Sequence, residues 1–391
     1  MYSGHIRDRK RKDGKNSHQI VIETMPDAIT GKRKRIYKTV NGTKKEAEKI
    51  MRKMLDDLDN QCFIKENNLT VSQWILDWFE LYLKDLSPTT LHGYKYQIDN
   101  YIVKSPIGNI RLQNLTTNDV QKWINGLSQC SPLSNKPVSA KTIKNIYHNL
   151  SASIDKAVSL DFVKKNVCKA VSLPKVQRYT AEVYDEAEIQ QLLSIIKGTD
   201  MELPLTIAVS LGLRRGELLG LKWKHIDFEN GLVSIEDNMV EVQKDVSEDR
   251  ILTKAPKSVS GQRTIPISSA LKDYLSKAHS DYVMRKQNMK DLFYDGDYVV
   301  CQENGRPYKP NSFSGKFNLF LKRNNLKHIR LHDIRHTNAT LMLTQGISPK
   351  VAQMRLGHSD YSTTMNIYSH VLKSVETEAA EAIENALFKN L

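Results

Sequence analysis

The sequence predicts a multidomain α+β protein, and three observations support this prediction. Its 391 residues are enough for two or three domains, and 40% apolar residues are enough to give each domain a core. Strand-like alternation is confined to short segments, whereas helical periodicity recurs along the chain. We expect a small basic N-terminal domain, an all-helical domain, and a mostly helical domain with a small β-sheet.

The N-terminal segment has the pattern of strands followed by one helix. Residues 17–24 alternate as a strand does, and a turn over 26–31 leads to a second strand over 32–40. Thr43 and Glu46 have the spacing of a capping box, which predicts a helix start. Apolar residues then recur at helical spacing, namely Ala47, Ile50, Met51, Met54 and Leu58.

Positive charge is concentrated in this first segment. Residues 1–55 contain sixteen Lys and Arg against six Asp and Glu, a net of +10 out of +14 for the whole chain. Clustered basic residues favour a polyanionic partner, and the alternative is a solvated face or a disordered basic tail. The candidate nucleic-acid contacts are Lys10, Arg11, Lys12, Lys32, Arg33, Lys34 and Arg35.

A second, helical segment follows a predicted linker over 61–68. Its first helix starts near Leu69, and further helices are predicted to start at the capping residues Ser87, Thr116 and Ser139. The first helix carries a stripe that we expect to face the core: Trp74, Trp78, Leu81 and Tyr82.

The third segment begins after a linker predicted over 173–186. An apolar run then contains a charged elbow, where Arg214 is a candidate anion ligand. The alternative is a helix-end arginine paired with Glu217. Strands are predicted over 232–235 and 239–242, and 253–266 is interpreted as a hairpin with Gly and Ser in its turn.

Residues 330–371 carry the chemistry. His332 and Arg335 stand three residues apart, so they share one face if this part is helical. A stop at Gly346 precedes a short helix predicted over 349–356, which ends at Gly357 with His358 just beyond. Tyr368 follows ten residues later. Arginine, histidine and tyrosine together suit a phosphodiester, with a phenolic oxygen available to attack it.

Several other classes of protein are disfavoured by the sequence. The cysteines Cys62, Cys130, Cys168 and Cys301 are scattered, which indicates neither a zinc knuckle nor a disulfide framework. His332 and His336 could be metal ligands, but no third ligand has a suitable spacing, so no metal is expected. No nucleotide-binding loop or carboxylate cluster indicates a cofactor. The chain has no signal peptide or membrane span in its pattern, which predicts a cytoplasmic protein.

The order H-x-x-R, then L-G-H-S, then a tyrosine ten residues on resembles the tyrosine recombinase family, above all the integrases of temperate phages and conjugative transposons. The resemblance covers most of the chain. It implies an arm-type DNA-binding domain over 1–62 with a three-stranded sheet and a helix. It also implies a helical core-binding domain over 69–170 and a catalytic domain over 178–391.

The resemblance also implies the site and the reaction. The implied catalytic residues are Arg214, Lys257, His332, Arg335, His358 and the nucleophile Tyr368. Lys257 is preferred to Lys254 by its distance to the Ile-Pro pair at 265–266. The expected reaction is site-specific recombination of double-stranded DNA at core and arm attachment sites, through a 3′-phosphotyrosyl intermediate and a Holliday junction.

The resemblance further implies a homotetramer on DNA, an excision factor and a host DNA-bending protein, with no membrane partner. The element moved is a prophage or a conjugative transposon. Two alternatives stay open on the residues: a type IB topoisomerase, and a non-catalytic DNA-binding regulator with the same fold.

The last residues of the chain predict an amphipathic helix. Apolar residues recur at intervals of three and four among four glutamates: Val375, Ala379, Ile383, Ala386 and Leu387. One interpretation is a helix packed on its own domain. The other, implied by the resemblance, is a helix that docks in trans on a neighbouring protomer.

Overall fold

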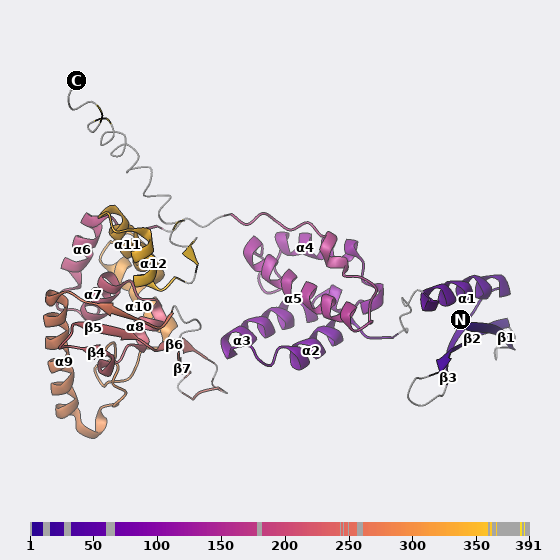
Figure 1. The fold of residues 1–391 in the computed structure, drawn as a ribbon, viewed down its shortest axis with the longest axis horizontal. Coiled ribbons are helices and arrows are strands. Elements are labelled where there is room, and N and C mark those ends of the chain that lie inside the picture. Colours follow the sequence, from indigo (N-terminus) through magenta and orange to yellow (C-terminus); the bar gives the residue numbers. More distant parts are fainter. Residues whose placement is uncertain are drawn as a thin grey trace. The chain divides into compact units, whose positions relative to one another are not determined.

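The computed structural model divides the chain into two compact units, Met1–Gln177 and Arg178–Leu391 (Figure 1). The residues that it describes are 2–10, 16–26, 33–59, 67–177, 182–242, 244, 246–248, 250–255, 261–358, 360, 361, 365, 384 and 387. The predicted turn over 26–31, the linker over 61–68 and the C-terminal amphipathic helix lie largely outside these residues.

A three-stranded antiparallel sheet and one helix form the N-terminal part. The elements are β1 (Ser3–Lys10), β2 (Asn16–Pro26), β3 (Arg33–Val40) and α1 (Lys44–Asp59), with the strands in the order β1-β2-β3. Ile20 and Ile22 of β2 are fully buried and cluster with Ala47 of α1. Thr43 and Glu46 form the predicted capping box. The expected sheet and helix are confirmed, and the basic run begins within β1.

The rest of the first unit is helical. Its main elements are α2 (Val71–Tyr82), α3 (Pro88–Gln97), a π-helix η1 (Ile98–Val103), α4 (Thr117–Gln129) and α5 (Ala140–Ser159). Trp74 and Trp78 lie in the core as predicted, but the prediction was wrong for Leu81 and Tyr82, which are 60% and 42% exposed. In the last turn of α2 it is Phe79 that packs against the core, as does Leu83 just beyond, so Leu81 and Tyr82 are left exposed. The Tyr82 ring lies 4.5 Å from the Lys156 ammonium instead.

The second unit combines helices with two small sheets. Its helices are α6 (Glu186–Ile196), α7 (Glu202–Leu211), α8 (Arg215–Gly220), α9 (Ser269–Met289), α10 (Pro310–Arg323), α11 (Leu331–Thr344) and α12 (Pro349–Leu356). Its strands are β4 (Ile226–Asp227), β5 (Leu232–Ile235), β6 (Asn238–Glu241), β7 (Ile251–Lys254) and β8 (Arg263–Pro266). The expected α+β class is confirmed.

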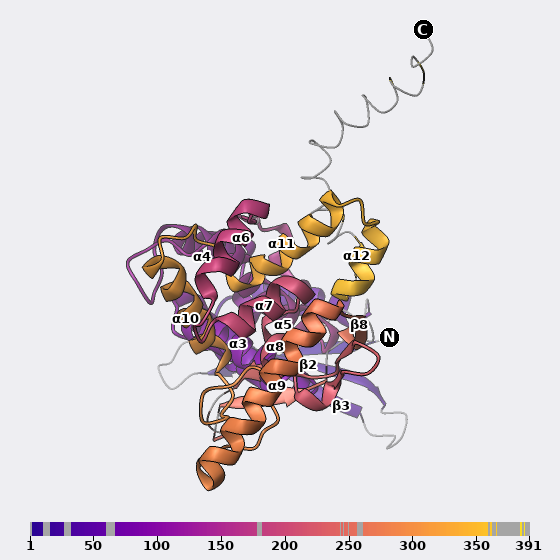
Figure 2. The ribbon, with the colours of Figure 1, turned by 90° about the vertical axis from the view of Figure 1, so that its left-hand side faces the viewer.

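The apolar run that leads to the charged elbow is α7, the centre of this unit. Leu205, Ile207 and Leu211 are fully buried, and α7 packs against α6, α8 and α11. Figure 2 shows α11 and α12 side by side, and these two helices are also in contact. The arrangement brings the end of α7, the start of α11 and the end of α12 together.

The predicted hairpin over 253–266 is wrong in its pairing. β7 pairs with β6 and β8 pairs with β5, so the chain reverses between β6 and β7. The reason is that β5 and β6 together run toward the reversal, and β7 and β8 together run back from it. The returning strands pair antiparallel with the outgoing ones, β7 with β6 and then β8 with β5. Two residues separate β5 from β6, whereas eight separate β7 from β8. Lys257 is among those eight and lies outside the described residues.

Within the ranges that the structure describes, no helix is both long enough and apolar enough to cross a bilayer.

Candidate active site

The C-terminus of α12 brings three arginines together. Carbonyl groups at a helix C-terminus have no partner within the helix, and they carry the negative end of the helix dipole. Here three successive carbonyls each accept a hydrogen bond from a different guanidinium. The pairs are Arg355 O with Arg263 Nε at 2.7 Å, Leu356 O with Arg335 Nη2 at 2.5 Å, and Gly357 O with Arg214 Nη2 at 2.6 Å.

Gly357 makes this arrangement possible. Its φ of 67° lies in the left-handed region, which glycine adopts without steric cost. The turn that follows places His358 next to Arg335, whose Nε donates to His358 Nε2 at 3.3 Å. The predicted helix, its glycine stop and the position of His358 are therefore all present.

Arg335 is the most buried member of the group. Its side chain is 1% exposed, and Nη1 donates to the Gly212 carbonyl at 2.9 Å. Burial, followed by the charge of Arg214, lowers the pKa of Arg335 to about 9. The guanidinium thus remains charged at neutral pH. Gly212 is required here, because its φ is 60° and a Cβ would come within 2.6 Å of Asn338 and Leu356 side-chain atoms.

Arg214 precedes α8 and keeps part of its side chain exposed. Its Nη1 donates to Glu217 Oε1 at 2.6 Å, and its backbone amide donates to Glu217 Oε2 at 3.0 Å. The helix-end pair with Glu217 is therefore real, but it does not exclude the functional interpretation. The same guanidinium also reaches the Gly357 carbonyl and lies in the group with Arg335.

Glu217 is a buried carboxylate that connects the arginines. It is 2% exposed, accepts from Arg263 Nη2 at 3.0 Å, and lies 3.9 Å from Arg335 Nη1. Burial by itself would raise the pKa of Glu217, but the hydrogen bond and charge of Arg263, together with Arg214, hold that pKa below its ordinary value. Glu217 thus stays ionised, and the guanidiniums around it outnumber its single charge.

The sequence did not identify Arg263, and it gave Glu217 only as an alternative partner of Arg214. Glu217 could have been found, because its spacing of three from Arg214 is that of a capping box, which the structure contains. No comparable local signal marks Arg263, since its partners Glu217 and Arg355 are 46 and 92 residues away.

The two predicted histidines occupy different environments. His358 is buried, and its pKa falls to about 3 because burial, Arg335 and Arg214 all oppose protonation. His332, on the first turn of α11, is exposed at the surface. Desolvation by the atoms packed around the ring, followed by the charges of His336 and Arg335, lowers the pKa of His332 to about 4. Both imidazoles are neutral at pH 7 in the DNA-free protein.

The low pKa of His358 predicts a loss of stability in acid. Between the unfolded value near 6.5 and the folded value near 3, the unfolded chain binds more protons, so stability falls as pH falls through this window. Between pH 7 and pH 5, His358 should account for about 2 kcal/mol of lost stability.

Denaturant unfolding of the wild type and of His358→Gln at both pH values tests this prediction. The variant is expected to lose less stability than the wild type on acidification, and the other histidines contribute equally to both proteins. An equal loss in the two proteins would contradict the burial argument.

Two predicted catalytic residues, Lys257 and Tyr368, lie outside the described residues. Lys254, the alternative to Lys257, is the last residue of β7, opposite Asn238 of β6. Tyr361, the other tyrosine close to His358, is 45% exposed. Both assignments therefore stay predictions.

The structure places only part of the predicted basic surface. Lys10 ends β1 and is exposed, and Arg35 of β3 pairs with Glu23 at 2.9 Å. The side chains of Arg33 and Lys34 are outside the description, as are the residues Arg11, Lys12 and Lys32.

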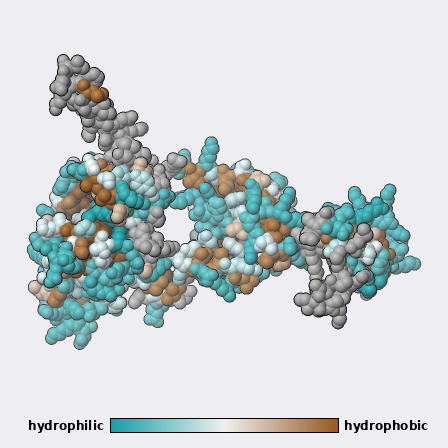
Figure 3. All heavy atoms as spheres, in the orientation of Figure 1, coloured by the Kyte–Doolittle hydropathy of each residue, from teal (hydrophilic) through white to brown (hydrophobic). Residues whose placement is uncertain are grey.

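Arg7 and Arg9 belong to the same basic run as Lys10, but they were not among the predicted nucleic-acid contacts. Ile6 packs on the core, so the odd-numbered residues of β1, Arg7 and Arg9 among them, point to the other face of the sheet. There Arg7 stands opposite Gln19, which in turn stands opposite Thr39. Hydrophilic residues dominate the visible surface of this part (Figure 3). The alternation in β1 could have revealed these arginines.

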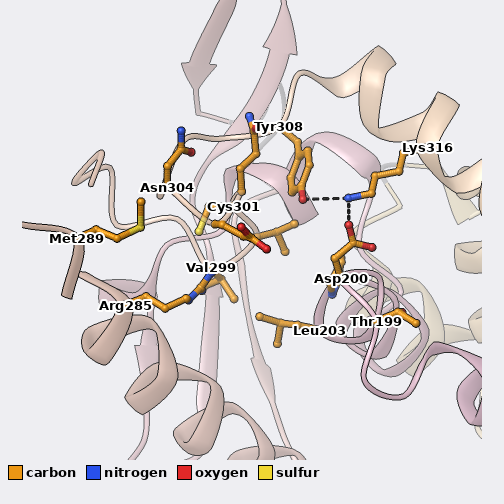
Figure 4. A pocket seen from close by; sticks show the side chains of 14 residues that line it. Thr199, Asp200, Leu203, Arg285, Met289, Val299, Cys301, Asn304, Tyr308 and Lys316 are labelled. Atoms are coloured by element: carbon orange, nitrogen blue, oxygen red, sulfur yellow. Dashed lines mark hydrogen bonds and ion pairs between the residues drawn. The ribbon is translucent and has the colours of Figure 1, made fainter. Parts of the chain in front are cut away.

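A cavity of about 570 Å³ lies elsewhere in the second unit. In Figure 4, Lys316 pairs with Asp200 and with the Tyr308 hydroxyl at its wall. Among the described residues, its lining includes none of the four placed catalytic candidates. We therefore take the arginine group at α12, and not this cavity, as the candidate active site.

Comparison with known proteins gives matches in both units. The phage integrase family matches residues 182–374, and the phage integrase N-terminal SAM-like domain matches residues 70–128. A tyrosine recombinase XerC-like protein of Caldanaerobacter subterraneus subsp. tengcongensis is 29% identical, covering 96% of this chain and 98% of its own length. The ICEBs1 integrase of Bacillus subtilis is 26% identical and covers 95% of this chain and 97% of its own.

Solved structures share the fold. The Tn1549 transposon integrase, in complex with a circular intermediate DNA, has a TM-score of 0.67 at 22% identity and covers 80% of this chain and 99% of its own. A lambda integrase dimer bound to a core site has a TM-score of 0.58 at 18% identity, covering 92% and 93%. The protein is a member of the phage integrase family of tyrosine recombinases, enzymes that cut and rejoin DNA.

Proposed function

We propose that this protein is a site-specific integrase that moves a prophage or conjugative element into and out of a bacterial chromosome. The observation that supports this best is the meeting of Arg214, Arg335 and His358 at the C-terminus of α12. A phosphodiester resists attack because its anionic oxygens repel a nucleophile, and the excess of guanidinium charge here opposes that repulsion.

Each residue has a definite role in the proposed reaction. Arg214 and Arg335 donate to the two non-bridging phosphate oxygens, which gain charge in the transition state. His332 and His358 supply further donors, and a bound phosphate raises the pKa values that desolvation and the neighbouring positive charges have lowered. One of these imidazoles helps to remove the tyrosine proton.

The bond changes balance without an external energy source. The Tyr368 oxygen forms a bond to phosphorus as the bond from phosphorus to the 5′-oxygen breaks, and Lys257 protonates that leaving oxygen. The 3′-phosphotyrosyl ester keeps the energy of the broken linkage. A 5′-hydroxyl from the partner duplex then attacks the ester, which releases the tyrosine and yields a Holliday junction after one strand exchange. This reaction requires neither a nucleotide nor a divalent metal.

A nicked suicide duplex carrying the junction of the element's own circular form tests the reaction class. Cleavage next to the nick frees a short strand that diffuses away, so the protein should remain covalently attached to the duplex. Absence of any covalent complex on this duplex, with binding intact, would favour the DNA-binding regulator. Plasmid relaxation without a partner site and without recombinant product would favour the type IB topoisomerase.

The proposal includes partners and a location. It places the protein in the bacterial cytoplasm as a homotetramer on two double-stranded DNA sites, with an excision factor and a host DNA-bending protein that set the direction. One solved relative is a lambda integrase tetramer bound to a Holliday junction, which supports the tetramer.

Deletion of residues 1–60 is expected to remove binding to arm-type sites and to spare cleavage at the crossover. The deleted part carries Arg7, Arg9 and the other basic candidates, but none of the proposed catalytic residues. Each lost phosphate contact should reduce the dependence of log K on log salt concentration by about 0.9. Binding titrations at several salt concentrations measure this slope, and an unchanged slope with the same set of sites would mean that the basic part is only a solubilising segment.

Truncation after Ser374 tests the proposed docking of the C-terminal helix in trans. The shortened protein should keep its fold and its affinity for a single site, but lose about tenfold in cooperative assembly because each protomer loses one contact with its neighbour. Gel-shift titrations on one-site and two-site duplexes separate these effects. Unfolding of the truncated protein, or unchanged cooperativity, would support a helix packed on its own domain.

A further inference from the structure

The guanidinium of Arg263 donates three hydrogen bonds: one to the end of α12, one to α8 and one to Gly261 just before its own strand, β8. Arg263 is the first residue of β8, which lies beside α12 (Figure 2), and its side chain is 7% exposed. The bonds are Nε to Arg355 O at 2.7 Å, Nη1 to Gly261 O at 3.2 Å and Nη2 to Glu217 Oε2 at 3.0 Å. Because the guanidinium is a rigid planar fork, these bonds fix α12 and α8 relative to the start of β8.

Arg263 also shares the Glu217 carboxylate with Arg214 and Arg335. Glu217 Oε2 accepts from Arg263 and from the Arg214 amide, while Arg335 Nη1 stands 3.9 Å away from the same oxygen. Without Arg263, the described residues that balance the charge of this buried carboxylate would be Arg214 and Arg335 alone. A DNA phosphate would then have to compete with Glu217 for both of these guanidiniums.

Arg263 also holds the end of α12 in place. Arg263 binds the first of the three carbonyls at which the arginines meet, and the next two hold Arg335 and Arg214. His358 follows directly and is bonded to Arg335. A shift of the Arg355 carbonyl would therefore move the anchors of the phosphate-binding residues, although Arg263 itself is too enclosed to meet DNA.

We propose that Arg263 is a positioning residue for DNA cleavage: it neutralises Glu217 and anchors the end of α12, so that Arg214, Arg335 and His358 keep the geometry and the charge that the phosphate requires. The proposal rests on the proposed function, since it needs those three residues to act on the phosphate.

The test compares binding with chemistry in Arg263→Gln. DNA affinity is measured by titration, and the rate constant of covalent complex formation is measured in single turnover on the nicked suicide duplex, at a temperature well below the unfolding midpoint. We expect affinity within about threefold of wild type and a rate constant lower by about 100-fold, the scale of a misplaced catalytic group. A merely structural role would lower the final yield and the unfolding temperature, and would leave the rate constant unchanged.

A double variant separates charge balance from packing. Glu217→Gln added to Arg263→Gln removes the carboxylate charge that would compete with the DNA phosphate for Arg214 and Arg335, so the double variant should cleave at least about tenfold faster than Arg263→Gln alone. If Arg263→Gln does not fold, Arg263→Lys replaces it and should lose about tenfold in rate, because it keeps the charge but not the three-way fork. Arg323→Gln, which removes the same charge from an exposed position on α10, is the matched control and should cleave at the wild-type rate.

The outcomes distinguish this inference from the proposed function. If wild type forms no covalent complex, the proposed function fails. If wild type cleaves and the Arg263 variant has the same rate constant, or if the double variant is no faster than the single one, only the role of Arg263 is overturned.

Discussion

Tyr368→Phe is expected to abolish covalent attachment to DNA and to leave DNA binding within about twofold of wild type. The substitution removes a single oxygen, which is the proposed nucleophile, and it removes no phosphate donor. Loss of an essential nucleophile typically costs about 10⁶-fold in rate, so no adduct should form on the nicked suicide duplex during overnight incubation. Denaturing gels measure the adduct, and gel shifts measure binding.

Tyr361→Phe is the matched control, because Tyr361 is the other tyrosine near His358 and is 45% exposed. Its adduct should form at the wild-type rate. A persistent adduct in Tyr368→Phe together with its loss in Tyr361→Phe would reassign the nucleophile.

Arg335→Lys is expected to reduce the cleavage rate by at least about 100-fold, which corresponds to roughly 3 kcal/mol for a lost transition-state donor. The guanidinium now serves the Gly212 and Leu356 carbonyls and His358 at once, and a single ammonium cannot reproduce that fork. Arg214→Lys should have an effect of similar size, because it loses the shared contact with Glu217 and the Gly357 carbonyl.

Arg215→Lys provides the control for these two variants. Arg215 is the immediate neighbour of Arg214, but its guanidinium bonds to Asn311 and Ser314 of α10 and not to the arginine group at α12. Its cleavage rate should stay within about threefold of wild type. Near-normal rates in both Arg335→Lys and Arg214→Lys would remove the electrostatic argument for the site.

Local signals made much of this protein predictable. Capping boxes depend on residues three positions apart, so the start of α1 at Thr43 and Glu46 could be read directly from the sequence. The same holds for α12, since Ser348 caps its start and Gly357 adopts the left-handed conformation at its end. The family resemblance depended on these short spacings as well. Where burial depends on neighbouring elements, as for Leu81 and Tyr82, prediction failed.

By itself, the sequence determined the fold class, the family and the residues that are candidates for the chemistry, because helical period, capping and motif spacing are properties of nearby residues. Only the tertiary structure decided that β8 pairs with β5, that Arg335 is buried while His332 is exposed, and that Arg263 joins the site. These outcomes rest on hydrogen bonds such as that from Arg263 to the Arg355 carbonyl, between residues 92 positions apart. No local pattern encodes such a bond, since it exists only after the core around α7 has brought α8, α11, α12 and β8 together.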